Sequence, residues 1–472
     1  MAKKKKKKSQ AVTLMVLILV IIALGFGYFV ARSFSENNGE KKYSLEDKKL
    51  IQKDVSKAKT LKYTLKGKEF VFVNENGIWK AESEKDRPLN QDSIKDMVSL
   101  FEEMTASKII YTNQDKIADF ALNKPALTVT LTMEDESSYS YSAGVPVVND
   151  ESGCYAIVQG FPGIYFLPEG YYKLFIEDLS DITQMPSITD ITSENITKIK
   201  ITKNSKVLID VAQDKNTEQW MIKEPYDYSV RTNAENMDVL ISKYVGYRFL
   251  KSINYNCTDF SKYGLDKPSS EIYLEYFTKD STSSTITKHT LKLSVGNSED
   301  DAAYYVRVND GNSVYTMSLN TIDFLTNVDP FDYVYTTLVD TDISDVAKAS
   351  FTVKGKAYDL QIERSDTIGT EDKGDKKTEN VYKLNGIEKE ASEVGTFYSK
   401  VNQINIVEKV GKNVNTSKPV CSIKVTDTNQ KEFNYNIYEY DVNYYAVQHE
   451  GHIYFLVDKR RVDDMAQTLE GL

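Results

Sequence analysis

The sequence is poor in cysteine and histidine. Its 472 residues include only three of each, and the cysteines are Cys154, Cys257 and Cys421. The cysteines are odd in number, lie far apart and form no CxxC pair, which disfavours a zinc site, a redox motif and a disulfide framework. We interpret them as half-buried apolar thiols. The chain must therefore be held together by its apolar cores.

Motifs of nucleophilic and phosphate chemistry are also missing. The sequence has no GxSxG elbow, no GxxxxGK[ST] loop and no GxGxxG after a predicted strand. His449 and His452 have no glutamate in HExxH spacing and no third ligand nearby, so we interpret them as turn residues. The acidic runs 297–301 and 340–345 lack the glycine and terminal glutamate of a calcium loop. We predict no catalytic, cofactor-binding or metal residue and no cofactor, and we expect a protein that is not an enzyme.

Positive charge is scarce outside the N-terminus. The net charge is −10, and residues 1–32 carry seven lysines and arginines and no acid, so residues 33–472 carry −17. A surface this acidic repels a phosphate backbone. Nucleic acid is therefore excluded as an expected partner, and the oligomeric state stays open.

One long apolar run stands near the N-terminus. Residues 11–31 contain no charge, and 21 residues make a helix of about 30 Å, the thickness of a bilayer core. The run exceeds the apolar stretch of a signal peptide, and the preceding lysines favour a cytoplasmic N-terminus. We expect a cytoplasmic polylysine tail (1–10), a transmembrane helix in the lipid bilayer (11–31) and a polar stalk (32–59). The predicted localisation is the cell membrane, single-pass, with the bulk of the chain extracytoplasmic.

The remaining sequence repeats itself three times. Similar strands open each copy, "TLKGKEFVFV" from Thr64, "ITKNSKVLIDV" from Ile201 and "TVKGKAYDLQI" from Thr352. Their Lys-Gly-Lys or Asn-Ser centres are typical of hairpin turns. A second turn follows and delivers Trp79 in the first copy and Trp220 in the second. A repeat of this kind decides the whole fold.

Each copy continues with an amphipathic helix and a Lys-Pro strand. The helices are expected in 89–104, 233–250 and 390–406, because apolar residues recur at i, i+3, i+4 and i+7. The dipeptides are Lys124-Pro125, Lys267-Pro268 and Lys418-Pro419. Proline suits the start of a strand, which favours structural punctuation over a binding role for Lys124 and Lys267.

Period-two alternation follows each proline. At proline +4 and +6 the buried residues are predicted to be Val129 and Leu131, Ile272 and Leu274, and Ile423 and Val425. A tyrosine-bearing hairpin closes each copy, and we align Tyr155, Tyr305 and Tyr445, and also Tyr165, Tyr315 and Tyr454.

The repeat sets the predicted domains and fold class. The copies span 60–183, 196–340 and a divergent 343–472. The predicted fold class is α+β, with a single N-terminal transmembrane helix followed by three similar modules of antiparallel strands plus a helix. Tyrosine is a good strand residue, so the 32 tyrosines do not by themselves indicate a binding face.

The phrase "YGLDKP" (263–268), followed by "LKLSVGN" (291–297) and "YYVRV" (304–308), resembles one family. It looks like the bacterial repeat called domain of unknown function 4340. The first copy departs from it with Phe120-Ala121, and the third lacks the Tyr-Gly-Leu segment. The resemblance implies a membrane-anchored envelope protein with no assigned reaction, similar to components found beside ABC-type export systems linked to gliding motility.

Three functions stay open. The leading hypothesis is a non-enzymatic single-pass cell-envelope scaffold, or an accessory protein of an ABC-type transporter with a membrane or envelope protein as partner. A surface module that binds cell wall or polysaccharide through tyrosine-rich sheets is the alternative. An envelope hydrolase comes third, because an acid pair cannot be singled out among 69 acidic residues.

Overall fold

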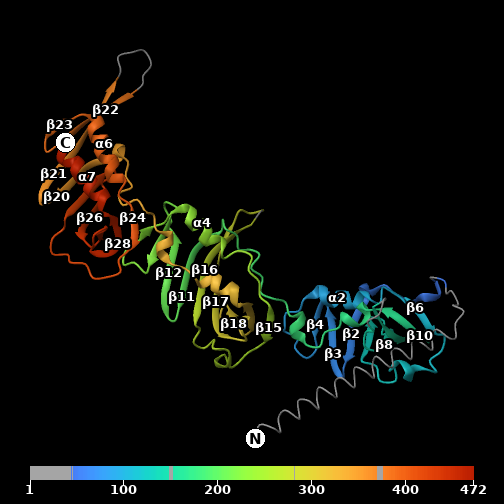
Figure 1. Ribbon diagram of the computed structural model, residues 1–472. Coiled ribbons are helices and arrows are strands. Elements are labelled where there is room, and N and C mark those ends of the chain that lie inside the picture. Colours follow the sequence, from blue (N-terminus) through green and yellow to red (C-terminus); the bar gives the residue numbers. More distant parts are fainter. Residues whose placement is uncertain (1–43, 45, 148–151, 281, 369–375) are drawn as a thin grey trace, which may run out of the picture. The chain divides into compact units, whose positions relative to one another are not determined.

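Antiparallel strands dominate the protein. The computed structural model describes residues 44, 46–147, 152–280, 282–368 and 376–472 (Figure 1). The described strands form one sheet of two strands, one of eight (sheet 1) and two of nine (sheets 2 and 3). Contacts divide the chain into a first unit that ends at Gln184 and a second that begins at Met185. The first unit holds sheet 1, and the second holds sheets 2 and 3.

The three large sheets share one strand order. In each of them, the first strand of the opening hairpin pairs with the strand that follows the Lys-Pro dipeptide. Sheet 1 runs β4 (Ile78–Ala81), β3 (Lys68–Glu75), β2 (Ala58–Leu65), β7 (Leu127–Met133), β8 (Ser138–Ala143), β9 (Gly153–Val158), β10 (Phe161–Pro168), β6 (Lys108–Tyr111).

Sheets 2 and 3 add one short edge strand to the same order. Sheet 2 runs β14 (Val230–Arg231), β13 (Trp220–Glu224), β12 (Lys206–Gln213), β11 (Ile196–Lys203), β16 (Ser270–Lys279), β17 (Ile286–Ser298), β18 (Ala303–Val308), β19 (Val314–Ser318), β15 (Lys251–Asn254). Sheet 3 runs β23 (Ile387–Lys389), β22 (Lys376–Leu384), β21 (Lys356–Ile368), β20 (Val346–Val353), β25 (Cys421–Asp427), β26 (Glu432–Glu439), β27 (Tyr444–His449), β28 (His452–Asp458), β24 (Ile406–Lys409).

Short helices accompany the sheets. The α-helices are α2 (Gln91–Ser99), α3 (Gly170–Lys173), α4 (Ala234–Ser242), α5 (Leu319–Thr326), α6 (Ala391–Asn402) and α7 (Lys459–Gly471). The 3-10 helices are η1 (Glu46–Lys48), η2 (Val55–Lys57), η3 (Ile117–Phe120), η4 (Leu179–Ile182), η5 (Ser261–Tyr263), η6 (Pro330–Tyr333) and η7 (Ile343–Asp345). Each large sheet buries one face against the helices of its own copy, and we call the other face the outer face.

The predicted amphipathic helix of the first copy is confirmed as α2. The Oδ1 atom of Asn90 accepts hydrogen bonds from the backbone N–H groups of Asp92 (3.0 Å) and Ser93 (3.3 Å). Such a cap satisfies N–H groups that have no partner within the helix. The apolar stripe from Ile94 to Phe101 is buried in the core of the first unit.

The predicted alternation of the Lys-Pro strands is also confirmed. All six residues at proline +4 and +6 are at most 1% exposed: Val129, Leu131, Ile272, Leu274, Ile423 and Val425. In each sheet this strand pairs with the opening strand of its copy, as Leu274 does with Ile199. The core-facing register is therefore the same in all three sheets.

The described residues of the second unit share one main apolar core. A single cluster of buried residues extends over sheets 2 and 3 and their helices. At the junction of the two sheets, the ring of Phe455 on β28 lies 5.1 Å from that of Tyr226 and 6.1 Å from that of Phe331. Lys409 and Asp329 form an ion pair of 2.5 Å beside them. The core of the first unit is a separate cluster.

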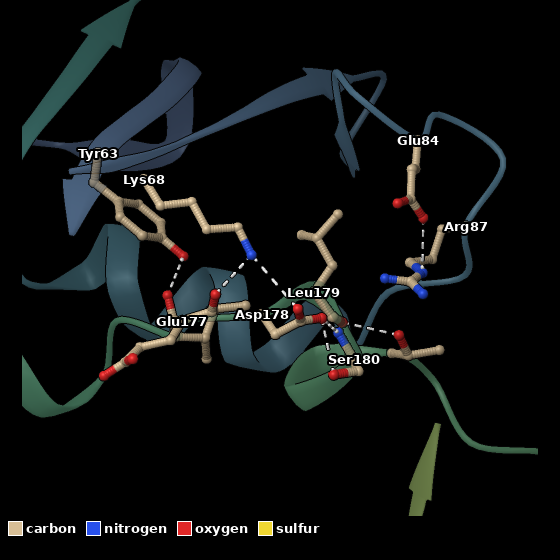
Figure 2. A network of polar contacts seen from close by, with 10 residues as sticks. Tyr63, Lys68, Glu84, Arg87, Glu177, Asp178, Leu179 and Ser180 are labelled. Carbon is tan, nitrogen blue, oxygen red and sulfur yellow. Dashed lines mark hydrogen bonds and ion pairs between the residues drawn. The ribbon is translucent and has the colours of Figure 1, made fainter. Parts of the chain in front are cut away.

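In the first unit the segment after α3 is fastened to the β2–β3 hairpin (Figure 2). The Nζ atom of Lys68 donates to the carbonyl oxygen of Glu177 (2.9 Å) and contacts Oδ2 of Asp178 (3.4 Å). The hydroxyl of Tyr63 donates to the carbonyl oxygen of Ile176 (3.3 Å). These contacts hold the segment over the buried ring of Tyr63, which is 1% exposed.

The structure corrects the predicted fold class. The described residues form four sheets, mostly of antiparallel strands, rather than three α+β modules. The fourth sheet pairs β1 (Lys49–Gln52), inside the expected polar stalk, with β5 (Glu103–Thr105). This strand forms because Leu50 and Ile51 are buried, each only 5% exposed. The charged residues around them hide these two apolar residues in the sequence pattern.

The expected membrane topology is corrected as well. The segment 11–31 lies outside the described residues. Within the described ranges, no helix is long and apolar enough to cross a membrane. The longest of them, α7, has 13 residues, or about 20 Å, against the roughly 30 Å of a bilayer core. The expected single-pass cell-membrane localisation therefore has no support from the described part of the chain.

Candidate functional site

The Lys-Pro segment, residues 117–125 in the first copy and 260–268 in the second, has one local structure in both. A single 3-10 turn ends at a residue in the left-handed region, Ala121 (φ 57°) or Gly264 (φ 68°). The next backbone N–H, of Leu122 or Leu265, donates to the carbonyl oxygen of Ile117 (2.9 Å) or Phe260 (3.0 Å). This is the hydrogen bonding that ends helical turns. The proline then leads into the strand.

The segment covers part of the outer face of its sheet. In the second copy Tyr263 and Leu265 form a small apolar cluster with Val314, apart from the main core. In the first copy Phe120 and Leu122 do the same with Ile164. Val314 faces this cluster whereas its neighbour Tyr315 belongs to the main core, as the alternation of a strand requires. Each of these two sheets thus has a second, smaller core on its outer face.

A glycine in the neighbouring strand makes room for the segment. A Cβ atom on Gly296 of β17 would overlap the carbonyl oxygen of Tyr263. At the equivalent Gly144 it would lie 3.4 Å from the carbonyl oxygen of Phe120. In sheet 3 Ile437 pairs with Cys421. The next residue, Tyr438, holds the position equivalent to the two glycines. The third copy lacks the Tyr-Gly-Leu sequence and the glycine together.

Two adjoining hollows lie beside the segment in sheet 2, and we call them together the polar trough. One has a volume of about 480 Å³ and the other about 510 Å³. Both are lined by Pro268 and Glu271. The larger one reaches Asn204 and Ser205 at the β11–β12 turn, and the other reaches Arg307 and Asp310.

The floor of the polar trough is a row of polar residues across four strands. Thr202 on β11 pairs with Glu271 on β16, Glu271 with Ser294 on β17, and Ser294 with Arg307 on β18. The Oγ atom of Ser294 lies 3.5 Å from Oε1 of Glu271. At about 4.8 Å per strand, the row is about 14 Å long.

Two of the three cations of the polar trough, Lys292 and Arg307, are held by groups of the protein. Lys292 forms ion pairs with Glu271 (2.9 Å) and Asp310 (3.3 Å), and its hydrogen bond to Glu271 raises its pKa. The guanidinium of Arg307 lies 3.9 Å from the ring centre of Phe260. It also donates to the carbonyl oxygens of Gly311 (2.6 Å) and Asp310 (2.5 Å). These contacts fix both cations at the wall of the trough.

The equivalent rows of the other sheets are uncharged. In sheet 1 the row is Thr64, Thr128, Ser142 and Ile157, and in sheet 3 it is Thr352, Ser422, Asn436 and Gln448. The charged row of sheet 2 is therefore particular to the second copy.

Sequence reasoning placed no functional residue in this row. Lys267 lines the polar trough and Lys124 is exposed at the equivalent place in the first copy. Glu271, Ser294 and Arg307 were missed, because they come from three strands. One signal in the sequence could have indicated the row. The residue three positions after each proline is polar and lies between buried residues, so it marks the outer face of each Lys-Pro strand.

The two histidines lie at the tip of the β27–β28 hairpin, as expected. The Nδ1 atom of His449 is 2.8 Å from the carbonyl oxygen of Asn434, and Nδ1 of His452 is 3.0 Å from Oδ2 of Asp227. No group of three histidine, cysteine or acidic side chains able to hold a metal occurs in the described part of the chain. Asp300 and Asp342, from the two acidic runs, accept hydrogen bonds from backbone N–H groups of their own turns.

The alignment of the tyrosine hairpins is right for two copies and wrong for the third. Tyr155 and Tyr305 both pack on the aromatic residue of the Lys-Pro segment, with ring centres 4.6 Å from Phe120 and 5.0 Å from Tyr263. In sheet 3 Ile437 pairs with Val447. This register places Ala446, rather than Tyr445, at the position that Tyr155 and Tyr305 hold in their sheets. Tyr445 instead points into the main core.

All three cysteines are buried and free. Burial raises the pKa of the Cys154 and Cys421 thiols to about 12. The thiolate is the reactive form, so at pH 8 we expect alkylation by iodoacetamide about a thousandfold slower than for a free thiol. Mass spectrometry of pulse-labelled protein, with and without guanidinium, checks this. Labelling of either cysteine in the folded protein at the rate of the denatured one would contradict it.

Comparison with known families matches residues 79–244 and 220–420 to the family described as "Domain of unknown function (DUF4340)". The two stretches overlap, begin at Trp79 and Trp220, and together cover more than half of the chain. Their overlap is consistent with a repeat of that domain, and no catalytic assignment comes with it. No curated protein matches the chain. The polar trough adjoins the Lys-Pro segment within the second match. Because the matches cover more than half of its length, the chain belongs to the DUF4340 family.

Proposed function

We propose that the chain is a non-enzymatic scaffold that holds another protein. The observation that supports this is the threefold use of one sheet, with one face buried by helices and an outer face only partly covered. Sheets 2 and 3 are joined through a common core, so they can present their surfaces in a fixed relation. Rigid elements position binding groups better than loops do.

The finer part of this proposal concerns the partner. By analogy with the components that the family resemblance suggests, we propose a permease or ATPase of an ABC-type transport system in the cell envelope. This step rests on the family alone, because a fold does not imply a function.

Crosslinking in the native organism tests the scaffold. The full chain, tagged at its C-terminus, is crosslinked in cells, purified under denaturing conditions and analysed by mass spectrometry, with an equally abundant tagged protein as control. We expect a transporter subunit enriched in near-stoichiometric amount and crosslinked to outer-face lysines such as Lys348 or Lys198. Recovery of the chain without any enriched protein would refute the scaffold, and enrichment of a different protein would refute only the transporter.

A further inference from the structure

We propose that the polar trough of sheet 2 is a binding site for a neutral oligosaccharide. This goes beyond the scaffold function and does not depend on it. The trough is bounded by the Lys-Pro segment on one side and floored by the row from Thr202 to Arg307.

The charge of the lining favours a ligand without net charge. Its acidic residues are Asp259, Asp266, Glu271 and Asp310, and its basic residues are Lys267, Lys292 and Arg307. The charges nearly cancel, and Lys292 and Arg307 are already engaged within the trough. An anion would have to compete with Glu271 and Asp310 for these cations, which costs their existing contacts.

Acceptors are nevertheless left for hydroxyl groups of a ligand. Oε1 of Glu271 contacts Lys292 and Ser294, whereas its Oε2 has no hydrogen bond within the described residues. The carboxylate of Asp266 is exposed and has none either in the same part of the chain. Hydrogen bonds from sugar hydroxyls to carboxylates are charge-assisted and therefore among the stronger ones. Hydroxyls of Thr202 and Ser205 can both donate and accept. The hydroxyl of Ser269 donates to the carbonyl oxygen of Val295 (3.2 Å) and can still accept.

The position of the trough argues against a peptide ligand. It crosses the face of the sheet, where β11, β16 and β17 are hydrogen-bonded on both sides, so no free strand edge is offered for strand addition. Apolar anchors of a peptide need apolar pockets, and the lining includes only Phe260, Leu265 and Pro268. One face of the Phe260 ring is already occupied by Arg307. A polar chain of sugar units fits a trough about 14 Å long better.

Calorimetric titration of the full chain with three hexasaccharides (maltohexaose, cellohexaose and chitohexaose) tests the proposal. We expect at least one of them to bind saturably to a single site. Glu271→Gln should weaken this binding about tenfold, because a charge-assisted hydrogen bond is replaced by a weaker neutral one. Asp266→Asn should weaken it severalfold without altering the fold, because this side chain is exposed and makes no hydrogen bond within the described residues.

Thr128→Val is the matched control, because Thr128 holds the position of Glu271 in the uncharged row of sheet 1. It should leave the affinity unchanged, and circular dichroism checks that all variants are folded. Hexalysine is titrated in parallel. The proposal is overturned if no hexasaccharide binds at millimolar concentration, or if Glu271→Gln and Asp266→Asn both leave the binding unaltered. Binding of hexalysine that depends on Glu271 would assign the trough to basic peptides instead.

Discussion

Replacing Phe397 by alanine is expected to lower the free energy of unfolding of the second unit by about 3–5 kcal/mol. The side chain lies on α6, is 1% exposed and packs edge-on against the ring of Phe351, with ring centres 5.0 Å apart. Truncation removes apolar contacts and leaves a cavity that the surrounding β-sheet cannot fill. Because the core is common to sheets 2 and 3, we expect sheet 2 to lose stability together with sheet 3.

The two tryptophans make this measurable. Trp79 lies in the core of the first unit, and Trp220 packs against the core of the second. Guanidinium unfolding is followed by fluorescence in Trp220→Phe, which reports the first unit, and in Trp79→Phe, which reports sheet 2. With Phe397→Ala added, the midpoint reported by Trp220 should fall and that reported by Trp79 should stay. An unchanged Trp220 midpoint would mean that sheets 2 and 3 unfold separately.

Alanine at Gly296 is expected to destabilise the second unit by about 1–3 kcal/mol. The added Cβ would collide with the backbone carbonyl of Tyr263, which no rotamer change can relieve. The Lys-Pro segment would have to leave the outer face, uncovering Leu265 and removing one wall of the polar trough. Thermal unfolding measures the stability, and oligosaccharide titration measures the trough.

Gly144→Ala is the matched control for this substitution. There the nearest atom to the new Cβ would be 3.4 Å away, an ordinary contact. Alanine also restricts the unfolded chain more than glycine does, so we expect a change in the free energy of unfolding within about 0.5–1 kcal/mol. Equal destabilisation by Gly296→Ala and Gly144→Ala would show that close approach of the segment is not the cause.

Much of the fold could be predicted from local sequence patterns. The hairpin turns at Gly67, Gly77 and Gly355 have positive φ, and the stripes of α2 and of the Lys-Pro strands are buried as their periods predict. Such features depend on residues close in sequence. The short strand β1 was hidden because two apolar residues among charges, Leu50 and Ile51, make too short a pattern to recognise.

Features that join distant parts of the chain could not be predicted from the sequence. The polar trough joins residues more than 100 positions apart, from Thr202 to Arg307, and the common core of sheets 2 and 3 depends on side chains such as Tyr226 and Phe455. The misplaced Tyr445 shows a different limit. In a strand, an error of one residue in the alignment moves a side chain to the opposite face, and matching letters alone cannot detect it.

Tyr438 and a Lys-Pro segment docked as in the second copy exclude each other. At that position any side chain would meet the carbonyl oxygen of the segment, as a Cβ atom on Gly296 would meet that of Tyr263. The outer face of sheet 3 therefore cannot take up the covering that sheet 2 has. Tyr438 is 5% exposed and its hydroxyl donates to Gln448 (3.1 Å). Glycine in place of Tyr438 alone would leave a cavity there, because the third copy has no Tyr-Gly-Leu segment to fill it.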